Sequence, residues 1–260
     1  MTQTAFRLER FVHHALTGQL GECLQLFHEL PATVPSGVLI SELIWPTLEC
    51  VQQLHLDRSI ATRTHNTAVR TLRALVEHLY SQLVSESAAA NRSLMVLTAP
   101  GERDELAAHI TASLAENAGW RTYFAGANLS AEEMMFAIGQ LGPDVVLFVS
   151  TLRASAASIQ QAVALLHRGR IWPRVQIAVC GAAMEETMNR PPTADIAARD
   201  AVEALEVLEL CPDYRATAKL AQHAQVPPAL HMPTAPEISI AHDAVRHMVA
   251  TFRGLVQHPN

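Results

Sequence analysis

The chain has 260 residues, a formal net charge of −6, 49% hydrophobic residues and 17% charged residues. This composition is typical of a folded globular protein, and the length suffices for one large core or two modest ones. The acidic balance argues against direct, unassisted nucleic-acid binding, and no run approaches the ~20 apolar residues of a membrane-spanning helix. The N-terminus also lacks the apolar core of a secretion signal, so we expect a cytoplasmic protein.

Only helical periodicity is present in residues 1–84. Apolar residues recur at helical spacing over 11–27, which predicts one or two short helices, and again over 39–54 and 68–79. We therefore predict an all-α domain, a helical bundle, over 1–84. A linker of small and polar residues follows at 85–91.

The segment 92–210 alternates apolar strands with helical stretches. The predicted strands cover 94–97, 122–124, 145–149 and 175–179, and a closing helix covers 200–210. Such alternation predicts a Rossmann-like, flavodoxin-like parallel sheet, so the fold class is α/β with an N-terminal all-α domain. Ligands of such sheets bind outside the carboxyl ends of the strands.

Small and polar residues gather at those carboxyl ends. We take them as candidate cofactor-binding residues: Thr98, Gly101, Glu102, Asp104, Ser150, Thr151, Leu152, Cys180 and Gly181. Asp104 is equally suited to cap the helix that follows it, and Ser150, Leu152 and Gly181 are equally suited to ending strands. Their joint position at several strand ends favours a ligand pocket.

Residues 211–260 form a C-terminal extension. Four prolines mark an irregular connector, and an amphipathic helix is predicted over 238–256. This helix is suited either to packing on its own domain or to contacting a partner. The four cysteines, Cys23, Cys50, Cys180 and Cys211, lack C-x-x-C spacing, so we expect buried, reduced thiols and no zinc site.

The turns of the α/β segment resemble those of cobalamin-binding domains in methionine synthase and corrinoid proteins, and are most similar to light-sensing regulators of the CarH type. The resemblance implies that Ser150 and Leu152, as an S-x-L turn, and Gly181 make room for the nucleotide tail of cobalamin. Cys180 replaces the first of two family glycines. Where the family reads G-E-R-H-E-L, with a histidine ligand to cobalt, this chain has Asp104, a poor donor for cobalt.

The helical segment also resembles the family's bundle, which lies over the upper face of the corrin and carries W-x-x-G-E-I followed by E-H. The matching stretch here is 53–66. Anchoring on Ile60 places His55 at the family's Trp, His65 at its Glu and Asn66 at its His, whereas a shift of one residue places His55 and His65 at two His positions. Because Asp104 replaces imidazole, we predict that His55, in preference to His65, ligates cobalt.

The resemblance implies a non-enzymatic, cobalamin-binding sensory or regulatory protein, responsive to light or redox state. It would bind adenosylcobalamin or hydroxocobalamin and act through a homo-oligomer or a regulatory partner protein, as antirepressors of the AerR type do. One alternative is a sensor of another tetrapyrrole, haem or a bilin such as biliverdin, alone or beside cobalamin, with Arg63, Arg70 and Arg73 pairing its propionates. Another is a corrinoid methyl carrier, against which Asp104 counts.

Overall fold

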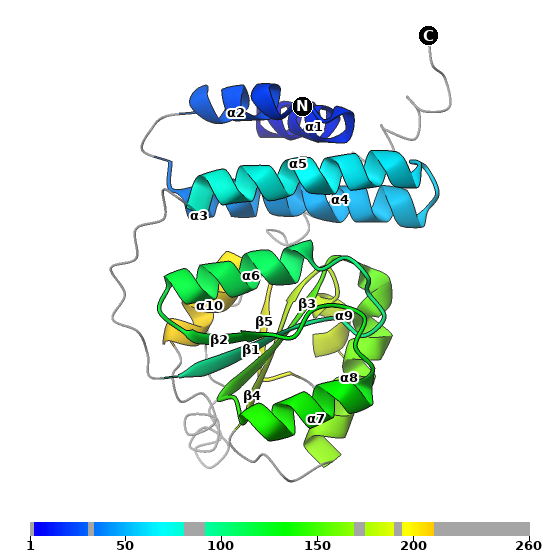
Figure 1. Ribbon diagram of the computed structural model, residues 1–260, viewed down its shortest axis with the longest axis vertical. Helices are drawn as coiled ribbons and strands as arrows, with labels where there is room; N and C mark the ends of the chain where they lie inside the picture. The colour runs from blue at the N-terminus through cyan, green and yellow to red at the C-terminus, as the bar shows by residue number, and fades with distance from the viewer. Residues whose placement is uncertain (1–2, 31–33, 81–91, 169–174, 190–193, 211–260) are drawn as a thin grey trace. The chain divides into compact units, whose positions relative to one another are not determined.

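The computed structural model describes residues 3–30, 34–80, 92–168, 175–189 and 194–210 (Figure 1). The described residues belong to two compact units, an N-terminal unit within 3–80 and a second unit within 92–210. Within these ranges, none of the helices is both long enough and apolar enough to span a membrane. The helix predicted over 238–256, like Cys211, lies outside the described residues.

The N-terminal unit is entirely helical, as the periodicity predicts. Its helices are α1 (Gln3–Thr17), α2 (Leu20–His28), α3 (Ser36–Leu39), α4 (Trp45–Leu56) and α5 (Thr62–Tyr80). A π-helical turn at Ile40–Ile44 joins α3 directly to α4, so the single helix predicted over 39–54 contains a change of winding. The core consists of fully buried side chains from all the long helices, among them Phe11, Leu48, Leu54, Leu72 and Leu75.

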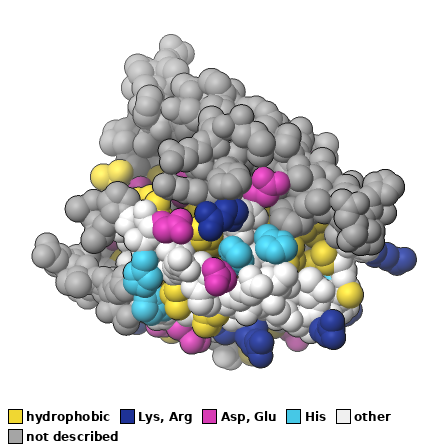
Figure 2. All heavy atoms as spheres, turned by 90° about the horizontal axis from the view of Figure 1, so that it is seen from above, with side chains coloured by type: hydrophobic (Ala, Val, Ile, Leu, Met, Phe, Trp, Pro, Cys, Tyr) yellow, Lys and Arg dark blue, Asp and Glu magenta, His cyan; other side chains and the backbone are white. Residues whose placement is uncertain are grey.

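Charged side chains of both signs and histidines are interspersed on the face of the molecule shown in Figure 2. Elsewhere in the helical unit, Arg10 of α1 lies 3.8 Å from Glu29, which follows α2, and both side chains are substantially exposed. An exposed pair of this kind contributes little to stability. Among the described residues on the face shown in Figure 2, the two signs of charge are mixed, and Lys and Arg do not form a cluster of their own.

The second unit is a five-stranded parallel sheet flanked by helices (Figure 1). The strands are β1 (Ser93–Thr98), β2 (Arg121–Phe124), β3 (Val145–Ser150), β4 (Gln176–Gly181) and β5 (Ile196–Ala198). The helices are α6 (Leu106–Asn117), α7 (Ala131–Leu141), α8 (Ala156–Arg168), α9 (Met184–Met188) and α10 (Ala201–Leu210). The strand order β2-β1-β3-β4-β5 is flavodoxin-like, which confirms the predicted fold class.

The strand order places a topological switch point between β1 and β3. From β1 the chain crosses to β2 on one side, whereas from β3 it continues to β4 on the other. Every residue of β1, β3 and β4 is buried, as expected for central strands covered on both faces. A crevice for a ligand is therefore expected where the carboxyl ends of β1 and β3 lie side by side.

Candidate functional site

The turns after β1, β3 and β4 are fixed to one another at the carboxyl edge of the sheet. Thr98 is in register with Val149, and Ser150 is in register with Gly181. Backbone hydrogen bonds continue past the strand ends: the Ala99 N–H donates to the Val149 carbonyl at 2.8 Å, and the Ala182 N–H donates to Ser150 at 2.9 Å. The structure thus brings together the residues predicted from the three turns, while their contact with a ligand stays a prediction.

Glu102 is the residue that joins these turns. Its side chain is only 6% exposed although it follows a glycine in a loop. The carboxyl group is hydrogen-bonded to the hydroxyl of Ser150 and, at 2.5 Å, to the hydroxyl of Ser155. The backbone N–H of Thr151 also donates to it at 3.3 Å, and its own backbone carbonyl accepts from the N–H of Asn128 at 3.1 Å. One glutamate therefore binds the turns after β1, β2 and β3.

Burial raises the pKa of Glu102, and the hydrogen bonds from Ser150, Ser155 and the backbone oppose that shift without cancelling it. Removing a carboxylate from water disfavours its charged form, whereas hydrogen bonds to the carboxylate favour it. Ser155 was missing from the sequence prediction, because it lies beyond the S-x-L motif in a short 3-10 turn (Arg153–Ser155). The signal in the sequence that could have identified Ser155 is its position five residues after Ser150, the polar end of β3.

Asp104 caps the N-terminus of α6, the role that the sequence offers as an alternative to ligand binding. Its Oδ1 accepts a hydrogen bond at 2.9 Å from the backbone N–H of Leu106, the first residue of α6. The helix N-terminus leaves such N–H groups without partners, and a carboxylate there is favourable. The cap is one residue earlier than a standard N-cap, because Glu105 occupies that position without a side-chain hydrogen bond to the helix.

Thr98 supplies an observation that points to a ligand. Its side chain is 2% exposed, and its hydroxyl oxygen has no hydrogen-bond partner among the described residues. A buried hydroxyl without a partner costs free energy, so such groups call for an explanation. Thr98 ends β1 at the switch point, where a ligand group with a hydrogen-bonding atom would satisfy it.

Two glycines give the turns backbone conformations that other residues rarely adopt. Gly101 has φ +87° in the exposed turn after β1, and Gly181 has φ +90° where β4 ends. Only glycine enters this region without a steric penalty from Cβ. Cys180, which replaces a family glycine, is completely buried.

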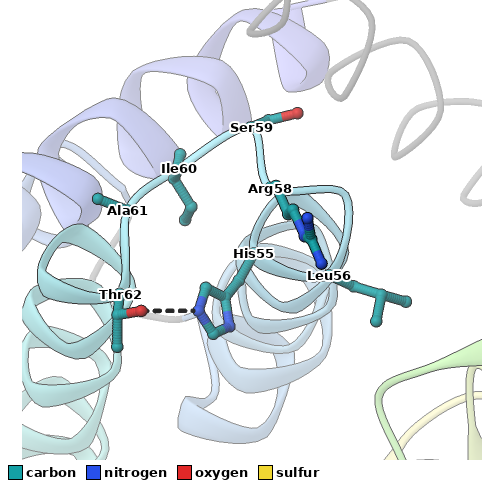
Figure 3. Close-up of a pocket in the computed structure, with 7 residues that line it drawn as sticks. All are labelled: His55, Leu56, Arg58, Ser59, Ile60, Ala61 and Thr62. Carbon is teal, nitrogen blue, oxygen red and sulfur yellow. Dashed lines mark hydrogen bonds between the residues drawn. The ribbon is translucent and has the colours of Figure 1, made fainter.

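The predicted bundle residues surround the connection between α4 and α5. A hollow of about 660 Å³ is lined by His55, Leu56, Arg58, Ser59, Ile60, Ala61 and Thr62. Figure 3 shows the His55 ring turned toward Thr62, with Nε2 and the threonine hydroxyl 3.4 Å apart. Leu56, which also lines the hollow, is 52% exposed.

The two histidines of this region differ in their surroundings. Their rings stack with centroids 4.3 Å apart, but His55 is half-buried whereas His65 is buried. Both ring nitrogens of His65 are already held, Nε2 by Gln52 and Nδ1 by Asn66, each at 3.2 Å. Asn66 itself is exposed. His55 is therefore the better placed of the two to bind a ligand.

The predicted arginines and the cysteines do not form a reactive or metal-binding cluster among the described residues. Arg63 and Arg70 are exposed and Arg73 is half-buried along α5. The described cysteines are buried and form no disulfide with one another, and burial raises the pKa of Cys23 and Cys50 to about 12, which makes these two thiols unreactive. Among the described residues there is no group of three or more His, Cys, Asp or Glu side chains able to hold a metal ion by themselves.

Comparison with known proteins finds one family match, within the α/β unit. Residues 92–209 match the family model of the B12 binding domain. No curated protein sequence matches the chain.

Two solved structures are similar to the chain, and the first of them shares its fold. The monomethylamine corrinoid protein of Methanosarcina barkeri has a TM-score of 0.62 and 16% identity, with 78% of this chain and 98% of that chain covered. A cobalamin-binding protein from Desulfitobacterium hafniense DCB-2 has a TM-score of 0.42 and 15% identity, covering 80% and 98% of the two chains. The match to the B12 binding domain supports a cobalamin or another corrinoid as the ligand of the domain at residues 92–209.

Proposed function

We propose that this protein binds cobalamin at the carboxyl edge of its parallel sheet, at the switch point between β1 and β3. The observation that carries the proposal is the buried, unpartnered hydroxyl of Thr98 at that point, in a domain that matches the B12 binding model. The turn residues fit such a ligand, because Gly101 and Gly181 hold open turn conformations and Glu102 fixes the turns to each other.

The turn after β1 supplies no imidazole to the metal. Bound cobalamin provides a cobalt ion with exchangeable axial ligands. Asp104 stands at the position of the family histidine, and one of its carboxylate oxygens accepts a hydrogen bond from the N-terminus of α6. Carboxylate is also a hard donor and a poor match for cobalt in a corrin. We therefore propose that His55 would be the protein residue that holds the cobalt, supported by its half-buried ring beside the hollow at 55–62.

Two roles are compatible with a corrinoid-binding protein of this kind. A corrinoid carrier, which presents its cofactor to a separate methyltransferase, is favoured by the fold shared with the monomethylamine corrinoid protein. A light- or redox-responsive regulator is favoured by Asp104, because the turn after β1 then offers the cobalt no imidazole. In both roles the output passes through another protein or through self-association, and the chain itself is not an enzyme.

The experiment that tests binding and distinguishes these roles is visible spectroscopy of the purified full chain. We expect the spectrum of adenosylcobalamin to change on addition of protein, and the purified protein to lack the bands of haem or biliverdin. Green light then separates the roles: a regulator changes its mass by light scattering after photolysis, whereas a carrier photolyses without a change in association. Spectra of haem or bilin in the protein as purified, with no response to cobalamin, would contradict the proposal.

A further inference from the structure

We propose that Glu102 is held as a neutral carboxylic acid, and that its single proton completes the hydrogen bonds that fix the turn after β1 to the turn after β3. Glu102 is on this view a positioning residue. Its importance for ligand binding rests on the proposed function, because these are the turns proposed to hold the corrinoid. The protonation state itself is a property of the protein without ligand.

Around Ser150, a single hydroxyl hydrogen faces two acceptors if Glu102 is ionised. The Ser150 hydroxyl oxygen contacts two acceptors, the Glu102 carboxyl group and the backbone carbonyl of Leu152 at 2.8 Å. It also accepts from the backbone N–H of Leu152 at 3.2 Å. A serine hydroxyl has one hydrogen, so it cannot donate to both acceptors at once.

A protonated Glu102 resolves this conflict. The carboxylic acid then donates from Oε1 to Ser150, and Ser150 donates to the Leu152 carbonyl. Ser155 donates to the same Oε1 at 2.5 Å. Oε2 accepts from the backbone N–H of Thr151 at 3.3 Å and from its hydroxyl at 3.4 Å. Every polar atom of the group then has a partner, which a buried network needs in order to be stable.

The electrostatic surroundings agree with the neutral form. Charged residues flank the two turns at Arg103, Asp104, Glu105 and Arg153. Among the described residues, however, only burial and hydrogen bonds shift the pKa of Glu102, and burial is the larger influence. A buried carboxylate without an opposite charge is costly, and protonation removes that cost.

Infrared difference spectroscopy of the protein without ligand tests the inference directly. The spectrum of wild type minus Glu102→Gln at neutral pH is expected to contain the carbonyl stretch of a protonated carboxylic acid. The matched control is Glu133→Gln. Glu133 is likewise bonded to a serine, Ser130, but it is fully exposed and hydrogen bonds from Ser130 lower its pKa. Its difference spectrum should contain only carboxylate bands.

A second experiment measures the affinity for hydroxocobalamin as a function of pH. If binding needs neutral Glu102, the affinity of wild type falls about tenfold for each pH unit above the pKa of Glu102 in the folded protein. The Glu102→Gln protein, which stays neutral at every pH, should lose that pH dependence, whatever its affinity at neutral pH. Glu133→Gln should keep the wild-type dependence.

Carboxylate bands alone in the Glu102 difference spectrum would overturn the inference, whatever the outcome with cobalamin. If Glu102→Gln fails to fold, Ser155→Ala replaces it. Loss of that hydrogen bond to Oε1 should shift the carbonyl band of a carboxylic acid, and a shift confined to carboxylate bands would overturn the inference equally. A carboxylic-acid band in a protein that does not bind cobalamin would uphold the protonation state and contradict only the proposed function.

Discussion

The side chains of Glu102 and Ser150 meet in a buried hydrogen bond although 48 positions separate them in the sequence. Glu102 comes from the turn after β1 and Ser150 from the last position of β3. The bond therefore crosses the switch point of the sheet and holds its two sides together. Both residues are predicted ligand contacts, and in the structure they are hydrogen-bonded to each other.

The Thr98 hydroxyl gives the first prediction. Replacing Thr98 with valine removes the hydroxyl while keeping the shape of the side chain, so the affinity for hydroxocobalamin should fall by about two- to tenfold, the contribution of one hydrogen bond. Thr47→Val is the matched control. The Thr47 hydroxyl is equally buried and equally without a partner among the described residues, but it lies in α4 of the helical unit.

Calorimetric titration of both variants measures the difference. Without ligand, each substitution should leave the protein as stable as wild type or more stable, since it removes an unsatisfied buried group. Equal affinities in Thr98→Val and wild type would show that this hydroxyl does not contact the ligand.

Gly181 should be intolerant of a side chain. Its φ of +90° is unfavourable for alanine, so Gly181→Ala should lower the free energy of unfolding by about 1–2 kcal/mol. Gly21→Ala is the control: this glycine lies in α2 at negative φ, and an added Cβ meets no atom within 4 Å. There alanine should stabilise the protein by up to about 1 kcal/mol. Urea denaturation measures both, and equal effects would contradict the role given to Gly181.

His55 and His65 should respond differently to alanine. His55→Ala should alter the absorption spectrum of bound hydroxocobalamin with little loss of stability, because its ring is half-buried and lies beside the hollow at 55–62. His65→Ala should instead lower the free energy of unfolding by about 1–3 kcal/mol, since it removes the buried hydrogen bond between His65 and Gln52. A spectrum unchanged by His55→Ala but altered by Asp104→Ala would show that Asp104, and not His55, contacts the cobalt.

The raised pKa of Glu102 predicts how stability changes with pH. The folded state keeps the proton at pH values where an unfolded glutamate, with a pKa of about 4.3, has lost it. The stabilisation is fully present below that value and is lost as the pH rises through the folded-state pKa. Relative to Glu102→Gln, wild type should therefore lose stability with rising pH. Thermal denaturation across acidic to alkaline pH measures this, and parallel curves would contradict it.

The fold could be predicted from the sequence because its strands are long, apolar and regularly spaced. The four predicted strands match β1 to β4 within one or two residues at each end. The strand β5 was missed because it has only three residues, Ile196–Ala198, too few to show a pattern. The short helix α9 escaped for the same reason.

The site was predictable as a location but not as a set of contacts. Polar residues at strand ends identified the edge of the sheet, because parallel strands bring their carboxyl ends together. The partners of Glu102 could not be read from the sequence, since Ser155 and Asn128 reach it only through the register of neighbouring turns. The same holds for the stacking of His55 on His65, which depends on the angle between α4 and α5.

The most direct test of cobalamin binding is isothermal titration of the full, folded chain with hydroxocobalamin in the dark. We expect saturable binding of one cobalamin per chain, weakened in Thr98→Val and unchanged in Thr47→Val. Circular dichroism on the same samples establishes that the protein is folded. Absence of binding heat with both hydroxocobalamin and adenosylcobalamin at two temperatures, on folded protein, would contradict the account.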